Sequence, residues 1–264
     1  MKGRKRKVTM KKIAPFIFVG LAILGLVLIL TGCEDGGNDS ALNPQTGSGG
    51  SMARFAITGN TLYIVTKQSL EVYDIENGAN PVKAVKKEMG VGIETIFPYR
   101  DNLYIGAMDG MYIFNNTDPR NPKLESKFQH IQSCDPVVVQ GKYAYVTLRS
   151  GVTCRPQNST SSLDVVDVSD PAAPKMVHTQ RMTSPYGLGV SGNRLFVCEG
   201  SVGLTVLDIT DPTKPVFKET MGDLPAYDII VRDKHLIVTG EKGLFQYKHD
   251  NADNIEFLSK IPVL

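Results

Sequence analysis

The chain has 264 residues, with 29 basic and 27 acidic side chains and no tryptophan. Seven of the basic residues lie within the first 12 positions, so the remainder carries 22 basic and 27 acidic side chains, a net charge of −5. A mildly acidic domain lacks the basic surface that binds nucleic acid, and the charge therefore excludes that class of partner.

Residues 1–32 have the anatomy of a processing signal, which lies outside the fold. A basic start leads into an uncharged apolar run from Ile13 to Leu30, and Leu30-Thr31-Gly32-Cys33 closes the segment. This tetrapeptide resembles the lipobox of bacterial lipoproteins, in which the cysteine is acylated and the preceding peptide is removed. The resemblance implies a signal peptide over residues 1–32 and lipidation of Cys33. The apolar run also just reaches the length of a membrane-spanning helix, so that alternative stays open.

Residues 33–51 form the next segment, which is rich in Gly, Asn, Ser and Asp. Such a composition cannot bury enough apolar surface to order itself, and it predicts a flexible tether. The pair Glu34-Asp35 directly after Cys33 resembles the surface-export signal of lipoproteins from Bacteroidetes-type bacteria. These resemblances imply an outer-membrane lipoprotein of the cell envelope, anchored by acyl chains such as palmitate and exposed at the cell surface.

Residues 52–264 repeat one strand pattern five times. The pattern Leu-x-Val-x-Asp ends seven residues before a proline in three copies, Leu70 to Pro81, Leu163 to Pro174 and Leu204 to Pro215, and Met111 to Pro122 and Leu244 to Ile255 are degraded copies. The Asp column reads Asp74, Asn115, Asp167, Asp208 and Lys248, in steps of 41, 52, 41 and 40 residues. A period near 40 with strand-type units predicts a radial all-β array, since no unit can bury its faces alone.

Each repeat predicts four antiparallel strands. A short apolar strand such as Phe55–Ile57 or Ile229–Val231 runs into a tight hairpin pair such as Gly59-Asn60, and a second apolar strand follows. The third strand carries the Asp column, and the fourth, such as Val82–Glu88, is more polar, as suits an outer edge. We therefore expect an all-β fold, a closed five-bladed β-propeller, with repeats at about 53–90, 91–130, 131–183, 184–223 and 224–264.

Two phrases within the repeats carry a family resemblance. Leu163–Pro171 and Leu204–Pro212 are similar to the LVIVD repeat of bacterial propeller proteins. Longer stretches resemble LVIVD-repeat lipoproteins of Bacteroidetes-type bacteria, and the likeness runs from about Ser51 to the end of the chain. The fifth copy departs from the pattern at Lys248 and Ile255. The resemblance implies no enzymatic activity, because none is assigned to the family.

Cys134 and Cys154 lie in the same repeat, the one that carries an insertion at Arg149 to Ser162. Exported cysteines meet oxidants, so a disulfide between Cys134 and Cys154 is expected, with two free buried thiols as the alternative. Cys198 is left over and is expected in the core. No histidine lies at ligand spacing from these cysteines, so we expect neither a metal site nor another cofactor.

Charged and aromatic residues recur where the first strands of the repeats begin, near the expected axis of the ring. They form a candidate axial pocket: Arg54, Glu94, Asp135, Arg149, Tyr186, Tyr227 and Asp228. These side chains would form a ligand pocket at the mouth of the channel. The alternative is an ion-pair plug inside the channel, which would have no ligand.

Catalytic motifs are missing from the sequence. The four histidines lie in different parts of different repeats, and no nucleophile elbow, His-Glu-x-x-His motif or calcium loop is present. We therefore expect a non-catalytic, lipid-anchored binding or assembly module, with an envelope protein or glycan as its partner. The alternative is a propeller hydrolase or lyase that acts on an extracellular glycan or small molecule through Glu94, Asp135, Asp228 and Arg149. A structural adhesin with Tyr and Phe on its outer strands is a third possibility.

Overall fold

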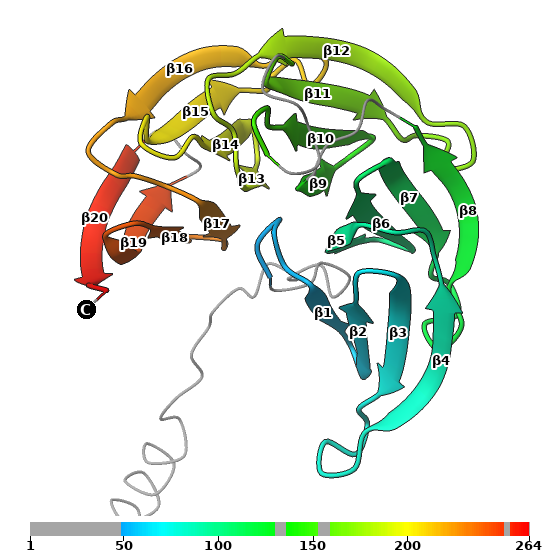
Figure 1. The fold of residues 1–264 in the computed structure, drawn as a ribbon. Coiled ribbons are helices and arrows are strands. Elements are labelled where there is room, and N and C mark those ends of the chain that lie inside the picture. The colour runs from blue at the N-terminus through cyan, green and yellow to red at the C-terminus, as the bar shows by residue number, and fades with distance from the viewer. Residues whose placement is uncertain (1–48, 130–135, 153–158, 251–253, 264) are drawn as a thin grey trace, which may run out of the picture. The chain divides into compact units, whose positions relative to one another are not determined.

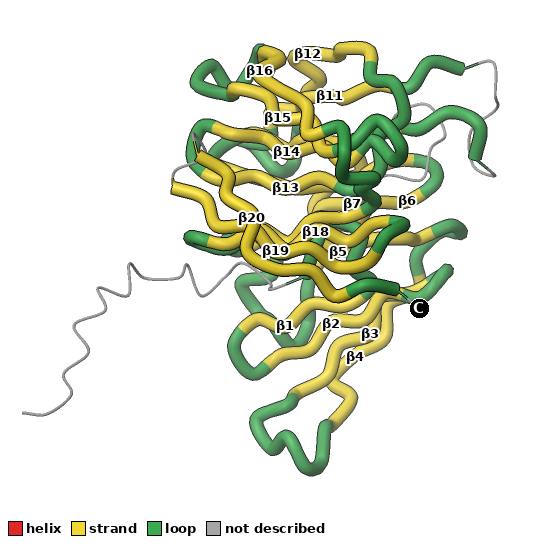
Figure 2. The backbone as a smooth tube through the Cα atoms, turned by 90° about the vertical axis from the view of Figure 1, so that its left-hand side faces the viewer, coloured by secondary structure: helices red, strands yellow, loops and turns green. Residues whose placement is uncertain are grey.

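The computed structural model describes residues 49–129, 136–152, 159–250 and 254–263. These residues form twenty strands in five sheets, and neither Figure 1 nor Figure 2 shows a helix among them. Nowhere in the described ranges is there a helix with the length and hydropathy of a membrane span. Cys33, Cys134, Asp135 and Cys154, for which the sequence predicts lipidation, a disulfide and a place in the axial pocket, lie outside the described residues.

Each sheet consists of four consecutive strands, and we number the sheets as blades 1 to 5 in chain order. Blade 1 contains β1 (Phe55–Thr58), β2 (Thr61–Val65), β3 (Ser69–Asp74) and β4 (Val82–Glu88). Blade 2 contains β5 (Ile93–Tyr99), β6 (Asn102–Ala107), β7 (Gly110–Asn115) and β8 (Lys123–Phe128). Blade 3 contains β9 (Val137–Gln140), β10 (Tyr143–Leu148), β11 (Ser162–Asp167) and β12 (Lys175–Arg181). Blade 4 contains β13 (Leu188–Ser191), β14 (Arg194–Cys198), β15 (Leu204–Asp208) and β16 (Val216–Met221). Blade 5 contains β17 (Asp228–Val231), β18 (His235–Gly240), β19 (Gly243–Asp250) and β20 (Asn254–Ile261).

The blades are arranged radially, as the repeats predict. The first strand of each blade lies nearest a common centre and the fourth lies on the rim (Figure 1). All neighbouring strands within a blade run antiparallel, as in the pairs of β1 with β2 and β3 with β4. The prediction of five blades, each with four antiparallel strands, is confirmed, and the architecture is that of a β-propeller.

The Asp column has a local structural role at the end of the third strands. The side chains of Asp74, Asp167 and Asp208 each accept a hydrogen bond from the backbone N–H two residues on, at 2.9, 2.8 and 2.8 Å. Asn115 does the same for Thr117 at 3.1 Å. Such a bond fixes the turn that leads to the fourth strand. The column therefore recurs because the same turn recurs.

A β-bulge also recurs in all five blades, between the third and fourth strands. The register shifts at Val72/Tyr73, Ile113/Phe114, Val165/Val166, Val206/Leu207 and Gln246/Tyr247. A bulge increases the local twist and bends the strand pair. The bulge persists in blade 5, where the sequence pattern is weakest.

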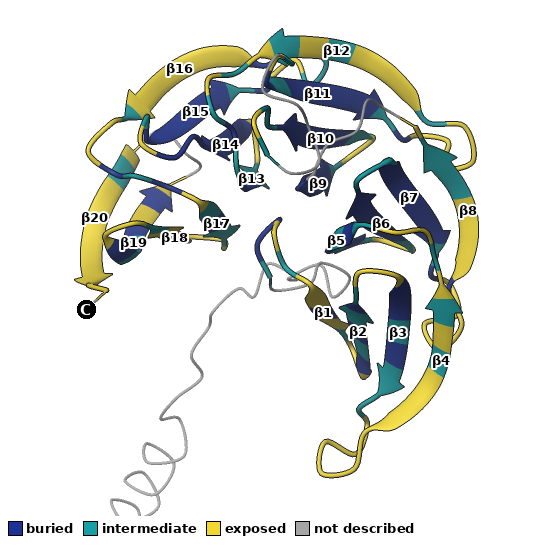
Figure 3. Cartoon of the chain, viewed as in Figure 1, coloured by how far each residue is buried: buried dark blue, intermediate teal, exposed yellow. Residues whose placement is uncertain are grey.

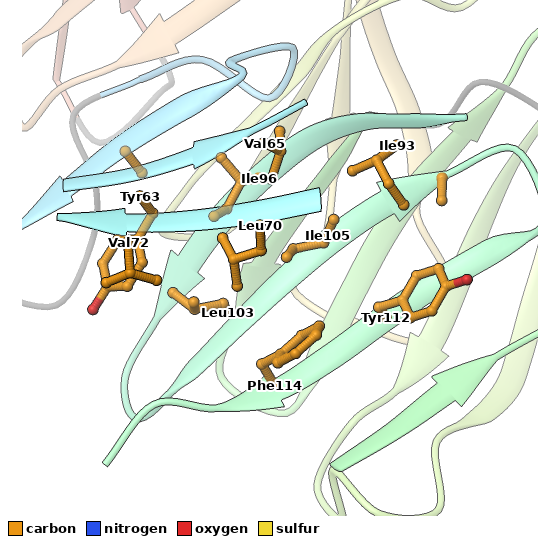
Figure 4. Close-up of a cluster of buried hydrophobic side chains, with 12 residues drawn as sticks. Tyr63, Val65, Leu70, Val72, Ile93, Ile96, Leu103, Ile105, Tyr112 and Phe114 are labelled. Atoms are coloured by element: carbon orange, nitrogen blue, oxygen red, sulfur yellow. The ribbon is translucent and has the colours of Figure 1, made fainter. Parts of the chain in front are cut away.

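The apolar core consists of four clusters, each between two consecutive blades. The cluster between blades 1 and 2 contains Tyr63, Leu70, Leu103 and Ile105, all fully buried (Figure 4). Three further clusters join blades 2 and 3, blades 3 and 4, and blades 4 and 5. Buried residues therefore concentrate on the inner three strands of each blade, and the outer strands are largely exposed (Figure 3).

Blades 5 and 1 share no such cluster in the part of the chain that the structure describes. Their ribbons stand apart in Figure 1, and Phe55 and Ile57 of β1 are 59% and 44% exposed. The sequence predicts a closed ring, and this part of the prediction is wrong for the described residues. Every sheet uses only consecutive strands, so no strand from one end of the chain completes a sheet at the other and links the two ends.

Candidate functional site

A pocket with a volume of about 460 Å³ lies at the end of the blades where the inner strands begin. Four of the residues that the sequence predicts for an axial pocket line it, namely Arg54, Glu94, Arg149 and Tyr186. Each comes from a different blade, since Arg54 precedes β1, Glu94 belongs to β5, Arg149 follows β10 and Tyr186 precedes β13. The radial arrangement of the repeats therefore brings together side chains that are up to 132 residues apart.

Backbone pairing fixes the positions of Arg54 and Glu94. The carbonyl oxygen of Arg54 accepts a hydrogen bond from the N–H of Val65 at 2.8 Å, which extends the pairing of β1 with β2. Glu94 is the extra residue of a β-bulge, because Ile93 pairs with Ala107 and Thr95 with Gly106. Bulges commonly redirect a side chain beside a functional site.

Tyr186 is held between neighbouring blades. Its N–H donates to the carbonyl oxygen of Cys198 at 2.7 Å, and its own carbonyl oxygen accepts from the hydroxyl of Thr147 at 2.6 Å. The backbone of Gly200, at a φ of +56°, lies against the ring, and a Cβ there would come within 2.9 Å of it. The ring therefore has little freedom to turn.

Arg149 stacks on this fixed ring. The central carbon of its guanidinium lies 3.7 Å from the centroid of Tyr186, and the ring of Tyr227 lies 5.1 Å from that of Tyr186 at an angle of 48°. A guanidinium over an aromatic face is attracted by the ring quadrupole. The stack orients the Arg149 side chain within the pocket.

The segment Gly49–Arg54, which we call the axial strap, crosses the centre of the blades. The hydroxyl of Ser51 accepts a hydrogen bond from the N–H of Leu188 at 2.7 Å and donates to the carboxylate of Asp228 at 3.3 Å. The carbonyl oxygen of Ala53 accepts from the N–H of Ile96 at 2.9 Å. The strap thus contacts blades 2, 4 and 5. The prediction of a flexible tether through residue 51 is wrong for Gly49–Ser51, because this stretch is hydrogen-bonded and Ser51 is buried.

Asp228 lies beneath the strap. A Cβ at Gly50 or at Gly187 would come within 2.5 Å of its carboxylate, so both positions need glycine. Burial raises the pKa of the Asp228 carboxyl to about 6, and hydrogen bonds from Ile229, Ser51 and Met52 oppose that shift. Asp228 is therefore a structural contact of the strap and does not line the 460 Å³ pocket.

A second, smaller cavity of about 170 Å³ lies beside the strap and is lined largely by the inner strands. It is bounded by Gly49, Gly50 and Ser51 and by apolar residues of β9, β13 and β17. No described residue lines both cavities. The axial space is thus divided in two, which the repeat pattern did not predict.

The ion-pair plug is not seen among the described residues. Arg54 and Arg149 form no salt bridge with a carboxylate there, and the strap occupies the axis instead. The described ranges also contain no group of three His, Cys, Asp or Glu side chains that could hold a metal ion. Cys198 is fully buried in the core between blades 4 and 5, and burial raises the pKa of its thiol.

The LVIVD repeat model matches the sequence over residues 49–86, 133–152, 158–180 and 186–223. These ranges fall in blades 1, 3 and 4. No curated protein matches the chain.

Several solved structures share the architecture. A functionally unknown protein from Desulfotomaculum acetoxidans is 10% identical, with coverage of 80% of this chain and 69% of that one and a TM-score of 0.64. The periplasmic gluconolactonase of Pseudomonas aeruginosa is 13% identical, with coverage of 78% and 68% and a TM-score of 0.58. The computationally designed Ika8 protein is 11% identical, with coverage of 74% and 57% and a TM-score of 0.55.

At these identities the likeness shows the fold alone, and the chain spans little more than half of the designed protein. The matched repeats, the four-stranded blades and their radial order agree with one another. The chain therefore carries LVIVD repeats, and these repeats fold as blades of a β-propeller.

Proposed function

We propose that the chain is a lipid-anchored binding module of the cell envelope, which holds part of a glycan or another envelope ligand in the 460 Å³ pocket. The observation that carries this proposal is the convergence of Arg54, Glu94, Arg149 and Tyr186 from four blades on one cavity. Pockets that bind small ligands typically measure about 300–1,000 Å³ and hold a few oriented polar groups. This pocket fits that description.

The lining favours binding over hydrolysis. Among the described lining residues, Glu94 is the only carboxylate. Glycoside hydrolysis generally uses two carboxylates that flank the bond to be cleaved. Asp228, which the hydrolase or lyase alternative requires, bonds to the strap instead. We therefore propose a site that recognises its ligand without cleaving it.

The proposal is tested with the purified chain on an array of polysaccharides and envelope fractions. Val152 lines the pocket, and Val152→Trp would fill part of it. We expect this variant to lose binding, while Val177→Trp, on the exposed strand β12, keeps it. Equal binding by both variants would place the ligand elsewhere on the surface. Conversion of a bound ligand to product would replace the binding role with an enzymatic one.

Membrane attachment through Cys33 is a separate part of the proposal, supported by the resemblance of residues 30–33 to a lipobox. We expect Cys33→Ser to release the protein from membranes or to leave it unprocessed. The measurement is membrane fractionation together with the intact mass. A variant that fractionates and is trimmed like the parent would rule out the lipid anchor.

A further inference from the structure

We propose that the pocket recognises a carboxylate, of the kind carried by a sugar acid, through the guanidinium groups of Arg149 and Arg54. This inference rests on the proposed binding function and names the chemical class of its ligand. It follows from the charge of the pocket, the partners of its arginines and the geometry of one of them.

The two arginines of the pocket differ from Arg194 and Arg120, which are paired with carboxylates in the described residues. Arg194 contacts Asp208 at 2.6 Å, and Arg120 contacts Asp74 across blades 1 and 2. In the described ranges, neither Arg54 nor Arg149 forms an ion pair with a carboxylate. Two guanidiniums face one cavity whose described lining holds a single acid, Glu94. The described lining residues therefore carry a net positive charge, which favours an anionic ligand.

The contact with Tyr186 positions the guanidinium of Arg149 to bind a carboxylate. The central carbon of the guanidinium lies over the ring, 3.7 Å from its centroid, so the tyrosine fixes where the guanidinium stands in the pocket. The N–H groups of a guanidinium form a fork that matches the two oxygens of a carboxylate. A hydrogen bond to the carbonyl oxygen of Tyr186 limits the movement of this tyrosine. Arg149, which lies over its ring, therefore loses less side-chain entropy when a ligand binds.

The size of the pocket indicates more than an isolated anion. A volume of about 460 Å³ exceeds what a bare carboxylate fills, so a ring or chain must accompany it. Thr95 and Glu94 add polar groups to the lining, and Pro136, Val152 and Met52 add apolar ones. A hydroxylated ring that carries one carboxylate satisfies both kinds of surface.

The test is isothermal titration calorimetry of the full chain with D-glucuronate, D-galacturonate, D-glucose and inorganic phosphate. We expect a sugar acid to bind and D-glucose to give no measurable heat. Arg149→Gln should weaken binding by about tenfold or more, since it removes a charge-assisted hydrogen-bonded pair. The affinity of Arg149→Lys should lie between those of the parent and of Arg149→Gln, because lysine keeps the charge but lacks the forked pair of N–H donors. Arg54→Gln should weaken binding as well.

Arg100→Gln is the matched control. Arg100 also lies over a tyrosine, Tyr99, at 5.3 Å, but it does not line the pocket, so this variant should bind like the parent. The melting temperature of every variant is measured to exclude unfolding.

The inference would be overturned if D-glucose bound as tightly as the sugar acids, if phosphate bound more tightly than they do, or if Arg149→Gln left the affinity unchanged. Absence of heat with both sugar acids would overturn it too. If neutral glycans are still captured in a manner that Val152→Trp abolishes, the binding function stands and only the ligand class is wrong. If the array also gives no capture that depends on Val152, both proposals fail.

Discussion

The four interfaces inside the propeller differ sharply from the seam between blade 5 and blade 1. Phe196 of β14 is fully buried in the cluster between blades 4 and 5, whereas Phe55 of β1 is 59% exposed at the seam. In blade 3, which has a neighbour on each side, nearly every residue of β10 is buried. In β2 of blade 1, buried and partly exposed residues alternate.

This difference shows that burial is a property of neighbours and not of the repeat itself. Blades 1 and 3 derive from the same strand pattern, yet only blade 3 buries both of its faces. In a repeat array, stability is approximately a sum of unit terms and nearest-neighbour terms. An end blade therefore contributes one interface fewer, and the axial strap is the described segment that links blade 1 to blades 4 and 5.

The largest contrast is expected between two phenylalanines. Phe196→Ala should lower the free energy of unfolding by about 3–5 kcal/mol, because it opens a cavity in a packed interface. Phe55→Ala should lower it by less than about 0.5 kcal/mol, as for other exposed positions. Urea denaturation of both variants measures the difference. A similar loss in both would show that blades 1 and 5 pack together in solution.

The next effect concerns Asp228 beneath the strap. Because burial raises its pKa to about 6 in the folded state, the folded chain keeps a proton that the unfolded chain releases near pH 4. Stability should therefore fall as the pH rises from about 4 to about 6, by roughly 2–3 kcal/mol for this group. Asp228→Asn should remove this dependence, as measured by urea denaturation across that pH range.

Asp211→Asn is the control for that pH series. Hydrogen bonds from Thr213 hold the pKa of Asp211 below its usual value. Its contribution to the free energy of unfolding is therefore lost as the pH falls, whereas that of Asp228 is lost as the pH rises. An unchanged pH profile in Asp228→Asn would mean that the carboxylate is solvated and that the strap does not cover it.

A smaller loss is expected when the strap loses its hydroxyl. Ser51→Ala removes the acceptor of the Leu188 N–H and a donor to Asp228, which should cost about 1–2 kcal/mol. Ser201→Ala, at an exposed position, should cost almost nothing. Thermal unfolding compares the two variants. Equal melting temperatures would indicate that the strap does not hold the blades together.

The smallest effect is expected at the rim between blades 1 and 2. Arg120 is 64% exposed and contacts both Asp74 and Glu76. Exposed ion pairs contribute about 0–1 kcal/mol, so Arg120→Ala should change stability by less than about 1 kcal/mol, and less still at high salt. A loss above about 2 kcal/mol in urea denaturation would show that rim contacts, and not the apolar clusters, join the blades.

The repeat pattern predicted the blades because local chemistry and tertiary position coincide in this fold. The Asp column marks a turn that each blade needs, and counting back from the hairpin pairs placed Arg54, Glu94 and Tyr186 at equivalent strand starts. The departure at Lys248 did not prevent blade 5 from forming, because β19 and β20 still pair from Leu244 to Asp250.

The strap and the seam could not be predicted from the repeat. Gly49-Gly50-Ser51 lies outside the periodic pattern, and its small residues are typical of a flexible tether. The close approach of this stretch to Asp228 nevertheless requires small residues. The bulge at Glu94 depends on how β5 pairs with β6, which no spacing reveals. Closure of the ring depends on the angle between blades, and the number of repeats does not determine that angle.

The use of four consecutive strands in every sheet has a consequence for the history of this architecture. Because no sheet borrows a strand from a distant part of the chain, duplication or loss of one stretch of about 41 residues leaves every other hydrogen-bond ladder intact. A gene with this organisation can change its number of blades in single recombination events. The number of blades can then vary among descendants while the design of each blade is inherited unchanged.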